Sequence, residues 1–422
     1  MQKQSLIKFP NGFKVVFSGK DSHTVGITLN IPYGVEKEAF RQSGISHLIE
    51  RLVYNDLSKQ IDRYNGELRT KVTFEYIEIS ILTIRQNIAK ILTALSRSIF
   101  DFTPKMDDFK RAKKMVVDNL EKNKLAPNYI LEKLTNESLY KKSGLSNNFY
   151  GVLASISKIE LDEVKQYLAK IISPNNLVLS IVGDIENANY KDDEDMRYSD
   201  IYSIVMEEFY GKLLSYRNHN AKFSEEIINK TKLYSEKTKL LYQDRFLIAY
   251  PCASYNSKNY KYVRLIDNYI QKYLEDYASN KDYIYGLKVE LVKYANNGYI
   301  KVLFAVDEDM AEEVYYKIIS LIDDIRVQGI SIGEFDKLKN SYIAKVIFNN
   351  ESVVDLSKSY AKKLALRGEV FDLDLEIEDI NGLQYDNFKI VMTETLSKKS
   401  ISVARVGKKR DDFIPFGERY EI

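Results

Sequence analysis

The stretch that decides the fold begins Asn11-Gly-Phe-Lys-Val-Val-Phe17. It continues through Val25-Gly-Ile-Thr-Leu-Asn-Ile-Pro-Tyr-Gly34 and reaches Gly44-Ile-Ser-His-Leu-Ile-Glu-Arg51. Apolar residues alternate with small or polar ones over Thr24 to Ile31, which predicts a half-buried strand. From Ile45 onward the apolar residues fall at helical spacing instead. The opening of the chain therefore predicts strands followed by a helix that begins just after a glycine.

Both halves of the chain end in the same way. A predicted helix over 161–172 leads into the apolar run 177–182, which stops at Gly183. A second predicted helix over 385–396 leads into the run 400–406, which stops at Gly407. The two closing units lie about half the chain apart, and this repetition favours a gene duplication.

The remaining apolar patterns predict further elements of both kinds. Predicted strands cover 6–9, 13–17, 67–73, 76–82, 246–250, 285–292 and 299–306. Predicted helices cover 57–64, 260–277, 310–325, 332–348 and 353–366, and the stretch 85–142 is rich in helix. This order predicts an α+β fold, with two tandem homologous α/β sandwich domains. Each domain is expected to have a mostly antiparallel sheet with helices on one face.

The predicted domains cover 1–184 and 236–422, with a linker and connecting helix over 185–235. The segment from Ile185 to Asp195 is polar and turns acidic at Asp192 to Asp195, which is typical of a solvated linker.

Composition excludes several classes of protein. Hydrophobic residues make up 45% and charged residues 29%, the balance of a soluble globular protein. Because Lys+Arg is 62 against Asp+Glu 60, we expect no nucleic acid or membrane partner. The single cysteine, Cys252, favours a reducing compartment. Neither a secretory signal nor an apolar run of about 20 residues is present, so we expect a cytoplasmic protein.

The quoted stretches resemble the opening of a peptidase of the pitrilysin (insulinase and mitochondrial-processing) family, of the small two-domain bacterial type. Glu38, Tyr64-Asn-Gly-Glu-Leu68 and Asn175-Asn-Leu-Val-Leu-Ser-Ile-Val-Gly-Asp184 also fit that family in order and spacing. Its members carry His-x-x-Glu-His on a helix, where two histidines hold a zinc ion and the glutamate activates the bound water. The resemblance implies a peptidase fold and covers both halves of the chain.

The zinc motif itself is degenerate. His47 matches the first histidine and Glu50 the general base, but Arg51 stands where the second histidine should be. A guanidinium group has no lone pair to offer and stays protonated. The resemblance puts Leu120 at the third ligand position and Lys113 at a supporting acid, whereas a slip of one residue would offer Glu121. We therefore name no catalytic residue, and His47, Glu50, Arg51 and Leu120 are vestigial positions.

Other residues offer little to a metal. His23, His47 and His219 are not at chelating spacing, and Cys252 lies in the other half of the chain. His47 and Glu121 remain weak candidate ligands. We expect no cofactor, and zinc would be expected only if the chain were an active enzyme.

The resemblance also suggests where a peptide would bind. Enzymes of the family pair an extended peptide with an edge strand, which matches 67–73 here and gives Arg69, Thr70 and Lys71 as candidates. Arg69 and Lys71 would share one face and favour an acidic peptide, or else protect a sheet edge from aggregation. Tyr285 matches a second-half tyrosine that holds the substrate, although it could equally be a core aromatic. The arginine that accompanies this tyrosine has no counterpart.

Three functions remain open at this point. The leading hypothesis is a non-catalytic subunit of a heterodimeric pitrilysin-type zinc peptidase, because the family closes a chamber with four such domains. Its partner would be an active subunit with an intact zinc motif, and the pair would process a peptide. The alternatives are a stand-alone or homodimeric peptide-binding scaffold and an active metallopeptidase with an atypical site.

Overall fold

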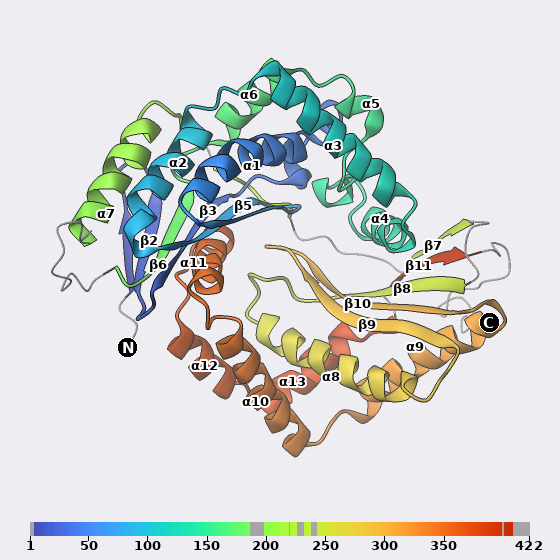
Figure 1. The fold of residues 1–422 in the computed structure, drawn as a ribbon. Helices are drawn as coiled ribbons and strands as arrows, with labels where there is room; N and C mark the ends of the chain where they lie inside the picture. The colour runs from blue at the N-terminus through green and yellow to red at the C-terminus, as the bar shows by residue number, and fades with distance from the viewer. Residues whose placement is uncertain are drawn as a thin grey trace. The chain divides into compact units, whose positions relative to one another are not determined.

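The computed structural model describes residues 4–185, 198–218, 220–225, 232–237, 243–398 and 401–407. These residues form two compact units, each assembled from separate parts of the sequence (Figure 1). Unit 1 combines Met1–Leu120, Asn147–Lys222 and Ile347–Asp372, and unit 2 combines Glu121–Ser146, Phe223–Val346 and Leu373–Ile422. The acidic run at 192–195 and His219 lie outside the described residues.

Unit 1 is built on a six-stranded sheet in the order β1-β2-β6-β3-β5-β4. The strands are β1 Gln4–Lys8, β2 Lys14–Gly19, β3 Thr24–Ile31, β4 Glu67–Val72, β5 Ile77–Ile84 and β6 Val178–Gly183. All neighbours are antiparallel except β2 and β6. Its helices are α1 Ile45–Arg63, α2 Ile88–Phe100, α3 Met106–Lys124, α5 Leu153–Ile156, α6 Leu161–Ile171, α7 Tyr198–Val205 and α11 Val353–Arg367.

Unit 2 repeats this plan with a five-stranded sheet in the order β7-β11-β8-β10-β9. The strands are β7 Lys232–Lys237, β8 Gln243–Pro251, β9 Ile284–Lys293, β10 Gly298–Asp307 and β11 Ser402–Gly407. Its helices are α4 Pro127–Leu139, α8 Tyr260–Ala278, α9 Ala311–Gln328, α10 Ile332–Phe348, α12 Leu373–Asn381 and α13 Tyr385–Thr395. The closing strand β6 lies parallel to β2 and antiparallel to β3. In the same way, β11 lies parallel to β7 and antiparallel to β8.

Short turns connect these elements. They are 3-10 turns at Val35–Lys37, Phe40–Gln42, Arg85–Asn87, Gly144–Ser146 and Glu308–Met310, and a π-helical turn at Met206–Gly211. No helix in the described part of the chain is both long and apolar enough to cross a membrane.

The apolar core of unit 1 lies between the sheet and one helical layer. Val25, Ile27 and Leu29 of β3 are fully buried there, with the apolar faces of α1, α2 and α6. The intervening residues of β3 point to the opposite face, because side chains alternate along a strand. That second face is covered by α11, a helix from the second half of the sequence (Figure 1).

Polar contacts fix α11 on the sheet. Ser357 lies 2.6 Å from Thr28 between hydroxyl oxygens, and Tyr360 lies 3.3 Å from Ser18. Gly26 of β3 faces the first turn of α11, where an added Cβ would lie 2.4 Å from the Val353 carbonyl oxygen. The glycine is therefore required by close backbone approach.

Unit 2 receives a helix from the first half of the sequence. Helix α4 packs on β11, β8 and β7. Ser402 donates to Ser138 at 2.6 Å, and Lys301 forms an ion pair with Glu132 at 2.7 Å. Each sheet is thus completed by a helix from the other half of the chain.

The α+β fold with two similar sandwiches is confirmed, and the predicted strand over 24–31 and helix over 332–348 match the structure. The separate helix predicted over 57–64 is wrong, because α1 runs unbroken from Ile45 to Arg63. Leu57 and Ile61 continue the buried stripe of the same helix. Helix α12 was not predicted. The domain limits at 184 and 236 stay a prediction.

Replacement of Gly26 by Ala should push α11 away from β3, because backbone atoms cannot yield as a flexible side chain can. We expect a loss of about 1 to 3 kcal/mol in the free energy of unfolding, measured by denaturant titration. Gly333→Ala is the matched control, since its nearest neighbour atom would lie 4.0 Å away. Equal stability of the two variants would contradict this account of Gly26.

Candidate functional site

The N-terminus of α1 is held by a buried carboxylate. Glu38 accepts hydrogen bonds from the backbone N–H groups of Gly44 at 2.7 Å and Ser46 at 2.9 Å. These are donors that the first turn of a helix leaves unpaired. Burial raises the pKa of Glu38 to about 7, although the two N–H groups oppose the shift. The acid that the sequence placed ahead of the motif thus fixes where the motif helix begins.

The His47 side chain contacts the neighbouring loop through Phe149. Its Nε2 atom lies 2.8 Å from the carbonyl oxygen of Phe149, and its ring meets the Phe149 ring edge-on at 5.2 Å between centroids. A carbonyl oxygen only accepts, so Nε2 carries the hydrogen and Nδ1 keeps the lone pair. Burial lowers the pKa of His47 to about 4. The ring is a neutral donor that fastens α1 to residues 147–151.

Glu50 and Arg51 form a polar group that reaches the sheet. The Glu50 carboxylate is buried, accepts a hydrogen bond from Thr70 Oγ1 and lies 3.5 Å from Arg51 Nε. The Arg51 guanidinium lies over the ring of Tyr54 at 5.9 Å. The position of the second histidine is therefore filled by a cation that neutralises the neighbouring acid.

The third ligand position belongs to the core. Leu120 of α3 is 6% exposed and packs in the apolar cluster of unit 1. Lys113 lies about two turns before Leu120 on α3. Its ammonium group donates to the carbonyl oxygens of Ser157 and Ile159, both at 2.8 Å. Glu121 forms an ion pair with Lys124 on the same helix. Each of these side chains has a structural partner.

The predicted peptide-binding strand, β4, is the edge of the first sheet. Thr73 N donates to Tyr76 O at 2.9 Å and closes the β4–β5 hairpin. Because hydrogen-bonded pairs alternate along an antiparallel ladder, Arg69 and Lys71 direct their backbone groups to β5. The backbone groups of Leu68, Thr70 and Val72 therefore point outward. These three residues turn their side chains toward α1.

Basic side chains gather on the other face of this edge. Arg69 and Lys71 are exposed there, and Arg69 lies 3.6 Å from Glu67 in an exposed ion pair. Lys71 is opposite Glu78 of β5. Burial raises the pKa of this acid, although nearby lysines oppose the shift. Two of those lysines, Lys358 and Lys362, come from α11. Their contribution could not be inferred from the first half of the sequence.

Tyr285 lies on β9 of unit 2 and is 39% exposed. Its hydroxyl donates to Asp307 Oδ2 on β10 at 3.4 Å. It is a surface residue of its sheet, so the alternative of a core aromatic is wrong. Its role in holding a peptide stays a prediction.

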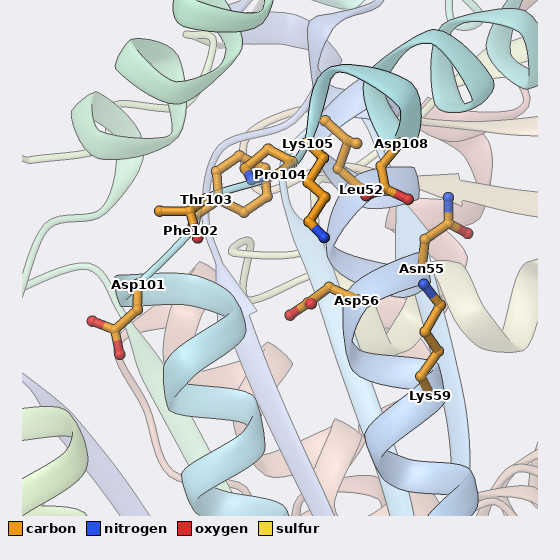
Figure 2. Close-up of a pocket in the computed structure, with 10 residues that line it drawn as sticks. All are labelled: Leu52, Asn55, Asp56, Lys59, Asp101, Phe102, Thr103, Pro104, Lys105 and Asp108. Atoms are coloured by element: carbon orange, nitrogen blue, oxygen red, sulfur yellow. The ribbon is translucent and has the colours of Figure 1, made fainter.

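A pocket of about 270 Å³ opens beside the second half of α1 in unit 1 (Figure 2). Its lining residues are Leu52, Asn55, Asp56, Lys59, Asp101, Phe102, Thr103, Pro104, Lys105 and Asp108. The Asp56 carboxylate accepts from Ser98 Oγ at 2.6 Å, and Asp101 forms an ion pair with Lys212 at 2.9 Å. The motif positions on α1 do not line it. Asp56 and Asp101 therefore link neighbouring elements of unit 1 at this pocket.

Solved structures share this fold over nearly the whole chain. A protease from Helicobacter pylori superposes with a TM-score of 0.83 at 16% identity, covering 96% of this chain and 100% of that one. A peptidase M16 inactive domain from Pseudomonas fluorescens gives 0.84 at 14%, covering 97% and 100%. A chain of complex III2 from Candida albicans gives 0.81 at 14%, covering 99% of each.

Sequence comparison points to the same group. Residues 158–342 match the family model described as the peptidase M16 inactive domain. The chain is similar to peptidases of the pitrilysin family in sequence and in fold. It is 18% identical to the uncharacterised zinc protease YmxG of Bacillus subtilis, over 89% of this chain and 91% of that one. It is 19% identical to the zinc protease PqqE of Helicobacter pylori, over 94% and 93%.

The residues of this pitrilysin-like chain do not fit the zinc ion of the family. His47 keeps one lone pair, on Nδ1, but Arg51 at the second position is a cation and Leu120 at the third is a hydrocarbon. Zinc sites in proteins use three or four N, S or O ligands. Across the described ranges, no group of three or more His, Cys, Asp and Glu side chains is placed to hold a metal ion.

Sequence reasoning found the motif positions but missed what they contact. The Phe149 carbonyl and the lysines of α11 come from distant segments, and no local pattern marks them. Thr70 was named as a peptide-binding residue, whereas its hydroxyl bonds to Glu50. A threonine on an edge strand gives no sequence signal of that partner.

Arg51→His alone should not create a tight zinc site, because Leu120 supplies no third ligand. We expect less than about one tenth of a zinc ion per chain after dialysis against micromolar zinc, measured by elemental analysis. The double variant Arg51→His/Leu120→Glu should bind more zinc than either single variant. Stoichiometric zinc in Arg51→His would show that the third position is wrongly assigned.

Glu38 and His47 should give stability opposite pH dependences. The folded state raises the pKa of Glu38 from 4.5 to about 7, so its contribution to stability is lost as pH rises through that window. The folded state lowers the pKa of His47 from 6.5 to about 4, so its contribution is lost as pH falls from 6.5 to 4. Each effect has a limiting slope of about 1.4 kcal/mol per pH unit.

Urea titrations at pH 5 to 7 should separate the two groups. Relative to the wild type, Glu38→Gln should gain stability as pH rises, and His47→Gln should gain stability as pH falls. Parallel curves for the wild type and both variants would contradict the assignment of these protons.

Proposed function

We propose that this chain is the non-catalytic subunit of a two-chain pitrilysin-type peptidase, binding peptide and shaping the chamber for an active partner. The observation that carries the proposal is the Glu50–Arg51 ion pair at 3.5 Å. A cation occupies the position of a zinc ligand and neutralises the residue that would act as the base. The described residues nevertheless form a helix-covered sheet in each unit.

Three further observations support the proposal. The matching family model is described as an inactive domain. Chains of this family without an intact motif usually pair with active ones. One structural neighbour is itself a chain of a complex, complex III2 of Candida albicans. None of these names the partner of this chain, which we define by chemistry as a pitrilysin-type chain with His-x-x-Glu-His.

The peptide would bind by strand addition to β4. The outward backbone groups of Leu68, Thr70 and Val72 offer a ladder for an extended chain. Arg69 and Lys71 beside this edge favour acidic side chains at alternate positions of the peptide. An acidic peptide is therefore the substrate class that we propose.

Co-expression with the pitrilysin-type chain of the same genome tests the proposal. We expect a one-to-one complex, measured by light scattering. The complex should cleave a quenched-fluorescent acidic peptide, and this chain without its partner should not. Glu50→Gln in this chain should leave cleavage at least partly intact, while the equivalent change in the partner should abolish it.

Two results would decide against the proposal. Cleavage by the purified single chain, lost in Glu50→Gln, would make it an active peptidase with an atypical site. A homodimer that binds peptide and ignores the partner would make it a peptide-binding scaffold.

A further inference from the structure

The residues of the lost zinc motif still make specific contacts, and those contacts reach the peptide-binding edge. The Glu50 carboxylate is 7% exposed and accepts a hydrogen bond from Thr70 Oγ1. Burying a carboxylate is costly unless it is hydrogen-bonded or paired. Glu50 has both kinds of partner, since Arg51 Nε lies 3.5 Å from its other oxygen.

Thr70 occupies a distinctive place on β4. Its backbone groups point outward from the sheet edge, while its side chain points back to α1. On its inner side β4 is held by β5, but among the described residues no strand lies on its outer side. The hydroxyl of Thr70 therefore links the middle of the edge strand to helix α1 through a hydrogen bond.

We infer that Glu50, with Arg51, is now a positioning residue that braces β4 through Thr70 and holds this edge ready for peptide. The inference rests on the proposed function, because it assigns a role in the same peptide site. Arg51 Nε lies near the Glu50 oxygen that Thr70 does not use, so the residue at the position of a zinc ligand supports the brace. The former general base thus acts on peptide binding without touching the peptide.

The brace explains why both acid and arginine are present together. A chain that had merely lost its metal could replace Glu50 with any residue that packs. Here the acid is buried against a hydroxyl of the edge strand, and the arginine lies over Tyr54 on the same helix. A free β-edge is otherwise prone to fray, since half of its backbone groups are unpaired.

Thr70→Val removes the hydroxyl at nearly constant shape, and Thr70→Ser retains it. Ser98→Ala is a matched control, because Ser98 Oγ also donates to a carboxylate of α1, that of Asp56 at 2.6 Å, but from α2. Each variant of the full-length chain is titrated into a fluorescein-labelled eight-residue peptide of alternating Glu and Val. Hydrogen exchange of residues 67–72 is measured by mass spectrometry on the same samples.

We expect Thr70→Val to weaken peptide binding about three- to tenfold, the effect of one hydrogen bond to a charged group. Exchange of β4 should accelerate in the same variant. Thr70→Ser and Ser98→Ala should keep wild-type affinity and wild-type exchange of β4. Glu50→Gln should fall between, because its amide oxygen still accepts from Thr70 but loses Arg51. It also keeps the inference testable if Thr70→Val does not fold.

Other outcomes distinguish the bracing of β4 from the proposed peptide-binding function. Wild-type affinity and exchange in Thr70→Val would overturn the brace and leave the proposed function standing. Equal losses in Thr70→Val and Ser98→Ala would also overturn it, since they would report general loosening of α1. If the wild type binds no peptide while only Thr70→Val accelerates exchange, the brace stands and the proposed peptide site falls.

Discussion

The insertion of the closing strand between earlier strands is the constraint on which both units depend. In unit 1, β6 pairs in parallel with β2 and antiparallel with β3, although residues 178–183 follow both by about 150 positions. A strand buried in the middle of a sheet satisfies its backbone groups on two sides and must be apolar on at least one face. All six residues of β6 are buried. The helices and the candidate site are positioned by this sheet.

The side chains of the candidate site are held in place by contacts within unit 1. Helix α1 is fixed at its first turn by Glu38, to a loop by His47 and to the sheet edge by Glu50. His47 is a neutral donor, and the charge of Glu50 is offset by Arg51. These side-chain contacts hold α1 against the loop and the sheet edge.

The sequence predicted the local elements well because their signals are local. Alternation marked β3, helical spacing marked α1, and the two closing units exposed the repeat. The motif positions also followed from local spacing. The contacts of those positions did not, since Phe149, Thr70 and the lysines of α11 reach the site through tertiary structure. The packing of α4 on the second sheet and of α11 on the first could not be predicted for the same reason. The apolar pattern of a helix does not indicate which sheet the helix covers.

This packing of α4 and α11 also governs the order in which the protein can be built during synthesis. The first sheet is complete in sequence once β6 has left the ribosome, but its second face lacks α11 until residues 353–367 emerge. Until then Thr28 and Ser180 of that face have no helix above them, and α4 has no sheet to cover. Neither unit can reach its final state on the ribosome before most of the chain has been translated. Premature termination before residue 353 would therefore leave the first sheet without the helix that covers its second face and the second sheet without its closing strand.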